Sequence, residues 1–314
     1  MPRPIEEVLS AEYIAFFLAS VAFIYLFFLV DRVLYQHGFL DKLTDRLVIS
    51  APTSLTILRV ASFLFFISLF GYGWVNKSFF LTPDLYTDNP LIKWLHLTIA
   101  VAALHRPASP IIGVCLLILW AMAVHQYGII HALDYIVFLG LAAFFIASGM
   151  RDCDMRTAGS VAMFALLGIN FGWLAIEKWA YPQWTYAMLE KRPELLFGIP
   201  PDTYMIFAGF VEFNVAFVLL GAVSSFSRVV ALGLGAIFVL AISQFGLIDA
   251  VGHLFIIAIL LILVLRGPTR ARHFMVLSDK SVWAHAYFMT GLYFLAFVMI
   301  FLAYYGLRHL YYGV

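Results

Sequence analysis

The chain has 314 residues, of which 64% are hydrophobic and only 12% are charged. A soluble domain carries about 45–50% apolar and about 25% charged residues, so this composition excludes a large soluble enzyme. Nineteen basic and eighteen acidic residues give a net charge of +1, which excludes the strongly basic surface typical of nucleic-acid binding. The composition therefore predicts an all-α polytopic membrane protein whose main partner is the lipid bilayer.

The hydropathy pattern predicts about ten transmembrane helices, since one crossing needs about 20 apolar residues. The predicted spans are 11–30, 56–75, 91–105, 111–127, 131–149, 158–177, 203–222, 229–247, 249–266 and 283–306. Lys93 and His96 make the span 91–105 the most polar of them. The connection 178–202 contains four prolines, which favours a structured cap with a short surface helix.

The positions of the basic residues predict the orientation in the membrane. Twelve of the nineteen Lys and Arg residues fall on the side away from the N-terminus. Cytoplasmic loops carry an excess of Lys and Arg, so that side is predicted to be cytoplasmic and both termini extracytoplasmic. Residues 1–10 lack the basic start of a signal peptide, and we expect the first span to be retained as an anchor. The expected location is the bacterial inner membrane.

Two sequence blocks recur in the same order. Residues 70–77 (FGYGWVNK) resemble 171–178 (FGWLAIEK), and 125–132 (HQYGIIHA) resemble 243–250 (SQFGLIDA). In the second pair of blocks, Gly128 and Gly246 stand where tight hairpin turns must occur, and glycine tolerates the backbone of such turns. The blocks predict two tandem four-helix units of the same orientation, as in parallel repeats.

This repeat divides the chain into four parts. They are an N-terminal helix with its cytoplasmic connection, a first four-helix unit, a second four-helix unit and a C-terminal helix, at residues 1–55, 56–150, 157–266 and 267–314.

The second unit contains several short motifs. They are Gly-Phe-Val-Glu at 209–212, Leu-Leu-Gly at 219–221, Ser-Arg at 227–228 and Glu-Lys-Trp at 177–179. In these motifs the second unit resembles the DoxX-like family of small four-helix membrane proteins, and the first unit resembles it weakly. The resemblance implies a membrane subunit of a quinone-linked oxidoreductase, as in the thiosulfate:quinone oxidoreductase membrane subunits. The first unit has no clear counterpart of Glu212, and a gapped alignment places His96 there.

Ionisable residues inside spans are functional candidates, because each costs about 2.5–3.5 kcal/mol to insert. Glu212 and Asn214 lie near the middle of the span 203–222. The other polar candidates lie toward the extracytoplasmic ends of their spans: His96, His125, Gln126, His131, Asp134, Glu177, Lys178, Gln244, Asp249 and His253. We expect both units to contribute to one polar site beneath the outer face.

Helical spacing suggests how these side chains could work. Asp249 and His253 are four residues apart and share one helix face, and His131 and Asp134 are three apart at the corresponding turn. A carboxylate beside an imidazole can orient the ring and exchange a proton with it, and both groups can bind a metal ion.

We therefore expect proton-transfer roles for Glu212, Asp249, His253, His131, Asp134 and Glu177. We expect His96, His125, Gln126, Gln244, Lys178 and Asn214 to line the binding site. The candidate metal ligands are His131, Asp249 and His253.

Each of these residues also has a structural interpretation. Asp134 favours a turn and could cap the short hairpin with His131. Glu177 and Lys178 could form an interfacial pair, with the lysine extending to the membrane surface. His96 and His125 could be histidines whose hydrogen bonds are satisfied within the bundle.

The leading hypothesis is an integral membrane subunit of a quinone-linked or other membrane oxidoreductase system, with other protein subunits as partners. Quinone or a metal ion would be its cofactor, whereas haem is disfavoured because no histidine spacing indicates a facing pair. Two alternatives stay open: a proton-coupled transporter of a small solute, and a structural or assembly subunit of a larger complex. The sequence leaves open whether the chain is itself an enzyme.

Overall fold

The computed structural model describes residues 2–75, 78–267 and 281–313. Within these ranges the chain is all-α apart from one antiparallel pair of two-residue strands, β1 (Ser78–Phe79) and β2 (Tyr86–Thr87). Lys77, part of a predicted repeat block, lies outside the described residues, as do Arg270, Arg272 and Lys280 of the charge count. Gln244 lies in a helix, but its side chain is also outside the description.

The first half of the chain forms helices up to residue 148. They are α1 (Ile5–Val8), α2 (Ala11–His37), α3 (Phe39–Thr44), η1 (Asp45–Leu47), α4 (Ala51–Val75), α5 (Leu91–Leu104), η2 (Arg106–Ala108), α6 (Ser109–Tyr127), α7 (Ile129–Ala132), η3 (Leu133–Tyr135) and α8 (Val137–Ser148). The second half contains α9 (Cys153–Ala180), α10 (Gln183–Lys191), η4 (Pro193–Leu196), α11 (Pro201–Gly221), α12 (Phe226–Phe245), α13 (Leu247–Arg266) and α15 (Val282–Tyr312). The short helix expected in the connection 178–202 corresponds to α10.

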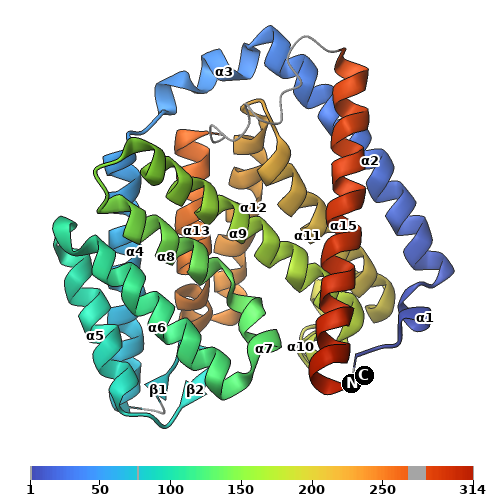
Figure 1. Cartoon of the computed structure of the whole chain (residues 1–314). Helices are drawn as coiled ribbons and strands as arrows, with labels where there is room; N and C mark the ends of the chain where they lie inside the picture. The colour runs from blue at the N-terminus through green and yellow to red at the C-terminus, as the bar shows by residue number, and fades with distance from the viewer. Residues whose placement is uncertain (1, 76–77, 268–280, 314) are drawn as a thin grey trace.

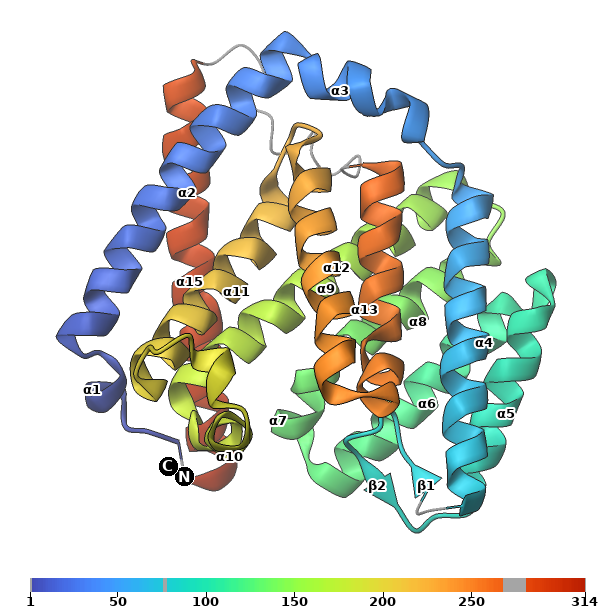
Figure 2. The same cartoon turned by 180° about the vertical axis from the view of Figure 1, so that it is seen from behind.

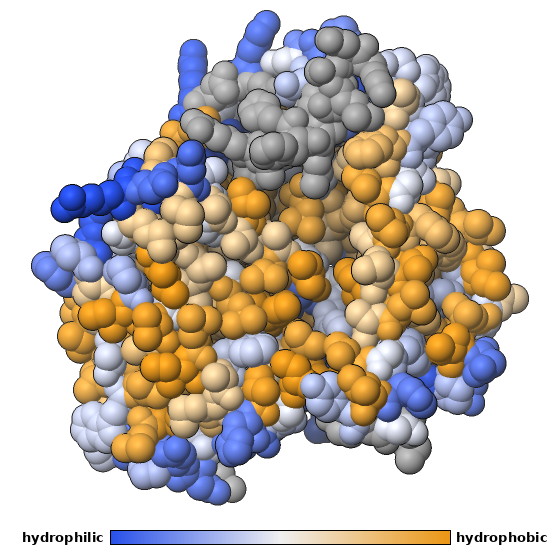
Figure 3. Space-filling view, viewed as in Figure 1, coloured by the Kyte–Doolittle hydropathy of each residue, from blue (hydrophilic) through white to orange (hydrophobic). Residues whose placement is uncertain are grey.

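Seven of the described helices are long and apolar enough to cross a membrane, namely α2, α4, α6 with η2, α9, α11, α13 and α15. The pair α7–η3 and α8 passes the same test as one broken span. Helix α5 and residues 226–240 of α12 are apolar but shorter. Hydrophobic side chains cover the middle of the molecule, while hydrophilic ones gather toward its two ends (Figure 3). The chain is a multi-pass membrane protein.

The predicted span 131–149 is not straight. Its two parts, Ile129–Tyr135 and Val137–Ser148, meet at an angle of 63°. The bend leaves the backbone N–H of Val137 without a partner in its own helix, and the buried side chain of Asn170 in α9 accepts a hydrogen bond from it at 3.1 Å. A bend in a helix needs such a replacement partner, and hydropathy alone does not show it.

The first span also extends further than predicted. Hydropathy ends the span 11–30 before the charged pair Asp31–Arg32, but α2 continues to His37. Asp31 is fully buried and accepts hydrogen bonds from the backbone N–H groups of Val223, at 2.8 Å, and Ser224, at 3.1 Å. The carboxylate thus joins α2 to the turn between α11 and α12.

Both termini lie at one end of the molecule, together with α10 and the β1–β2 strands, whereas α3 lies at the other end (Figures 1 and 2). Helices α2 and α15 pack against each other along one side, and α4 packs against α5 at the opposite side. Between them, α9 contacts both α8 and α11. Following the sequence prediction, we call the end that carries the termini the outer end.

The two glycine turns have matching geometry. Gly128 has φ +85° and Gly246 has φ +89°, a left-handed backbone that glycine adopts without a side-chain clash. The N–H of Gly128 donates to the carbonyl of Val124, and that of Gly246 to the carbonyl of Ile242, both at 2.8 Å. The packed helix pairs also occur in a matching order along the chain. They are α4–α5 and α6–α8 in the first half and α9–α11 and α12–α13 in the second half.

Candidate functional site

The best-defined polar pair is His131 with Asp134, just after the Gly128 turn at the outer end. The Nδ1 atom of His131 lies 3.3 Å from Asp134 Oδ2. The indole N–H of Trp173 donates to Asp134 Oδ1 at 2.9 Å. Only 8% of the Asp134 side chain is exposed, against 36% for His131. The carboxylate is therefore buried at the Nδ1 edge of the imidazole, and the imidazole itself remains partly accessible.

Aromatic rings surround the accessible imidazole. The ring centroid of His131 lies 5.7 Å from that of Tyr127, 6.1 Å from Tyr135 and 6.3 Å from Trp184. Trp184 belongs to α10, so the cap between α9 and α11 reaches over the turn that carries His131. The imidazole nitrogens of His131 are therefore bordered by flat aromatic side chains.

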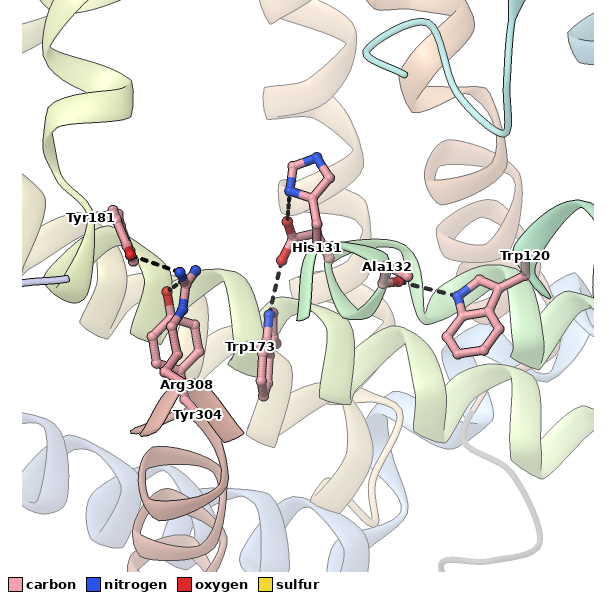
Figure 4. A network of polar contacts seen from close by, with 8 residues as sticks. Trp120, His131, Ala132, Trp173, Tyr181, Tyr304 and Arg308 are labelled. Atoms are coloured by element: carbon pink, nitrogen blue, oxygen red, sulfur yellow. Dashed lines mark hydrogen bonds and ion pairs between the residues drawn. The ribbon is translucent and has the colours of Figure 1, made fainter. Parts of the chain in front are cut away.

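Arg308 of α15 lies beside this pair (Figure 4). Its guanidinium donates to the hydroxyls of Tyr181, at 2.7 Å, and Tyr304, at 3.1 Å. The Tyr304 ring in turn packs against Trp173, with 4.8 Å between centroids. Arg308 is buried and interacts electrostatically with both Asp134 and Glu177. The positive charge of Arg308 thus offsets part of the desolvation penalty of the Asp134 and Glu177 carboxylates.

Lys178 and Glu212 form the second polar pair, with 2.7 Å between Nζ and Oε2. The predicted interfacial pair of Glu177 with Lys178 is not an ion pair of this structure. Neighbouring residues on a helix point about 100° apart, so Lys178 faces α11 while Glu177 faces Arg308. The Oε1 atom of Glu177 is buried and has no hydrogen-bond partner among the described residues.

The third pair, Asp249 with His253, lies on α13. His253 Nδ1 is 3.3 Å from Asp249 Oδ1, and the imidazole packs on Phe238 with 4.9 Å between centroids. The Oδ2 atom of Asp249 is buried and has no partner in the part of the chain that the structure describes.

Asp84, in the loop between β1 and β2, connects the pairs of the two halves. It interacts electrostatically with His253, Asp249 and His131. Its side chain is accessible to water, yet the surrounding protein removes enough solvent to raise the pKa of the carboxyl above its ordinary value.

Several residues that we expected to line a binding site have structural partners instead. His96 is buried and donates from Nε2 to the carbonyl of Phe80 at 2.6 Å. Gln126 donates to the carbonyl of Tyr86 at 3.0 Å and so holds the loop after β1.

Asn214 also has structural partners. It donates to Ser20 at 3.1 Å and accepts from Tyr293 at 2.8 Å, which connects α11 to α2 and α15. His125 is exposed and faces a separate cavity that Asn89 and Met122 also line.

The proposed metal ligands do not come together. Among the described residues, no group of three His, Cys, Asp or Glu side chains has an arrangement that could hold a metal ion. His131 has a carboxylate neighbour on one helix and His253 on another, but each pair offers only two ligands.

Sequence reasoning missed Asp84, Arg308, Trp173, Tyr181 and Tyr304. Arg308 contributes to the orientation prediction only as one of the counted basic residues. Asp84 lies outside every predicted span. Each reaches the site by packing between segments far apart in the sequence, for which the chain itself carries no local signal.

No protein-family model matches the chain, and neither the curated proteins nor the solved structures include a match. The resemblance to the DoxX-like family therefore stays a prediction, and the site geometry carries the functional argument.

Proposed function

We propose that this protein is a membrane subunit of a quinone-linked oxidoreductase system and that its His131–Asp134 pair exchanges protons with a quinone headgroup near the outer face. The observation that carries the proposal is the accessible imidazole of His131, held from behind by a buried carboxylate and bordered by aromatic rings. A quinone headgroup is a flat ring with oxygen atoms at its edge, which suits stacking and hydrogen bonding at such a site.

The proton chemistry follows from the pair. The Asp134 carboxylate lies 3.3 Å from Nδ1 of His131, which favours the tautomer that carries its proton on Nδ1 and leaves Nε2 as the basic nitrogen. Nε2 can then accept a proton from a quinol hydroxyl, and the nearby carboxylate stabilises the resulting positive charge. Trp173 fixes the carboxylate in place. A quinol releases electrons together with its protons, so the proposal requires a redox cofactor on a partner subunit to accept those electrons.

The proposal includes ten spans and a tandem duplication. The spans are the seven long helices, the broken pair α7–α8, and the shorter helices α5 and α12. The matching turns at Gly128 and Gly246, with their hydrogen bonds of equal length, support the duplication. The Lys and Arg bias supports the outer end as extracytoplasmic, and the proposal includes the bacterial inner membrane as the location.

A proton-coupled carrier is the second candidate, and the Lys178–Glu212 pair favours it. This ion pair lies between the apolar helices α9 and α11, yet 24% of the Lys178 side chain and 32% of the Glu212 side chain are exposed. Protonation of Glu212 would remove the attraction and free Lys178 for an anionic solute.

The test is quinone binding to the full-length protein in lipid nanodiscs. A short-chain benzoquinone should quench tryptophan fluorescence in a saturable way, because Trp184 lies beside His131. Loss of a charge-assisted hydrogen bond costs about 1.5–3 kcal/mol, so His131→Ala should weaken binding at least about tenfold. The matched control is His105→Ala, an exposed histidine at the other end, which should bind as the unchanged protein does.

Other results would replace the proposal. If quenching does not saturate, or if His131→Ala binds as tightly as His105→Ala, the quinone site is wrong. Proton-driven solute uptake into liposomes that Glu212→Gln abolishes would favour the carrier. Stable co-purification with other subunits, without quinone binding, would favour a structural or assembly role.

A further inference from the structure

A cavity of about 450 Å³ opens at the end of the molecule opposite the termini. The starts of α4 and α9 and the ends of α8 and α13 border it, and η2 closes one side. It therefore lies across the membrane from the His131 site, on the predicted cytoplasmic side.

Three arginines line this cavity. Arg106 comes from η2, Arg156 from the first turn of α9 and Arg266 from the last turn of α13. None of the described residues that line it is acidic, and Arg106 and Arg156 belong to none of the described ion pairs. Three guanidinium groups around one hollow give it a positive potential, which favours an anion.

The backbone adds to the positive potential. Helices α4 and α9 both begin at this cavity, and the first residues of each, Ala51 and Cys153, line it. A helix N-terminus carries partial positive charge and unpaired N–H groups, which favours anions and phosphate groups in particular. The carboxylate of Asp152 already accepts from the N–H of Asp154 at the start of α9, so the arginines carry the larger part of the attraction.

The inner wall of the cavity is apolar. Leu55, Phe144 and Val161 line it, and Leu55 and Phe144 are buried core residues. Ser160 adds a hydroxyl near the arginines, since Arg266 donates to its Oγ at 3.4 Å. A fitting ligand thus has a charged group for the arginines and an apolar part for the inner wall.

We propose that this cavity binds a phosphate group through Arg106, Arg156 and Arg266. Guanidinium groups form paired hydrogen bonds with phosphate oxygens, which makes arginine the preferred residue for such contacts. The phosphate could come from an anionic phospholipid of the cytoplasmic leaflet, because basic pockets between membrane helices bind such headgroups. It could equally come from a soluble phosphate compound of the cytoplasm. The site does not depend on the quinone proposal.

The experiment is thermal unfolding of the purified full-length protein in detergent at constant ionic strength. The probes are dihexanoylphosphatidylglycerol and inorganic phosphate, and dihexanoylphosphatidylcholine serves as a phospholipid without net charge. The variants are Arg156→Gln and Arg266→Gln. The matched control is Arg151→Gln. Arg151 is an exposed arginine in the connection between α8 and α9, and it does not line the cavity.

We expect phosphatidylglycerol to raise the unfolding temperature in a saturable way, with about tenfold weaker apparent affinity in each cavity variant and no change in Arg151→Gln. A response to phosphatidylglycerol alone identifies the lipid as the source, and an equal response to inorganic phosphate identifies a soluble compound. If neither probe gives a saturable shift, or if the cavity variants respond as Arg151→Gln does, the proposal is wrong. If Arg156→Gln does not fold, Arg156→Lys and Arg106→Gln provide the same comparison.

Discussion

Lys178, near the end of α9, donates a hydrogen bond of 2.7 Å to Glu212, in the middle of α11. The two helices also pack along their length, so the ion pair adds a polar contact to an apolar interface. Both side chains are partly exposed, and their attraction is therefore weaker than that of a fully buried pair.

Removing both partners should measure this coupling. We expect a double-mutant cycle of Lys178→Ala and Glu212→Ala to give an interaction energy of about 1 kcal/mol, measured by thermal unfolding in detergent. Glu190→Ala serves as the control, because Glu190 is an exposed residue of α10 outside the described ion pairs. Strictly additive single-variant effects would show that the pair contributes nothing to stability.

The buried carboxylate of Asp31 should contribute more. Asp31→Ala leaves the N–H groups of Val223 and Ser224 without their acceptor, and each buried unsatisfied group costs about 1–3 kcal/mol. We expect a loss of about 2–5 kcal/mol in the free energy of unfolding and a smaller loss for Asp31→Asn, which keeps one acceptor oxygen. The exposed Asp88, changed to Ala, is the control. Equal unfolding temperatures for Asp31→Ala and Asp88→Ala would contradict the assignment.

Local spacing predicts much of the polar arrangement. His131–Asp134 and Asp249–His253 stand three and four residues apart, and in both pairs the imidazole nitrogen lies 3.3 Å from the carboxylate. A single helix or turn fixes such a distance, so sequence is sufficient. The same holds for Gly128, whose turn follows from the near absence of residues between two predicted spans.

Long-range packing accounts for what the sequence did not predict. Arg308 reaches Asp134 only because α15 crosses α9, and Asp84 reaches His253 only because the β1–β2 loop packs beside α13. Hydropathy also treats a charge as a break, and for this reason it misplaced the end of the first span at Asp31. The partners that permit such a buried charge lie about 190 residues away.

Close packing makes Gly209 a sensitive position. A Cβ atom there would overlap Nε1 of Trp179 and lie 3.0 Å from the carbonyl oxygen of Ala175. The indole is held by its own hydrogen bond to the carbonyl of Ile206, at 3.1 Å. Because overpacking costs about 1–3 kcal/mol, we expect Gly209→Ala to lower the free energy of unfolding by that amount.

A second glycine provides the comparison for this prediction. Gly291 lies within α15, and apart from the adjoining residues and backbone of its own helix no described atom lies within 4 Å of the position that a Cβ atom would take there. Alanine in a helix interior is favoured over glycine by about 1 kcal/mol, so Gly291→Ala should be neutral or stabilising. Thermal unfolding of the two variants side by side measures the difference, and a stabilising Gly209→Ala would show that α9 and α11 are less closely packed than described.

Asp84 should make stability depend on pH in a specific direction. Burial raises the pKa of its carboxyl, and Asp249 raises it further, while His253 and His131 act in the opposite direction. A carboxyl with a raised pKa in the folded state favours folding when it is protonated, and this advantage is lost as the pH rises through that pKa.

Asp84→Asn should therefore raise the unfolding temperature at pH 7 but leave it nearly unchanged at about pH 3, below the ordinary carboxyl pKa. The exposed Asp88, directly after β2, should show no such difference when changed to Asn. A lower unfolding temperature for Asp84→Asn at pH 7 would contradict this prediction, because it would mean that the two histidines stabilise the charged carboxylate.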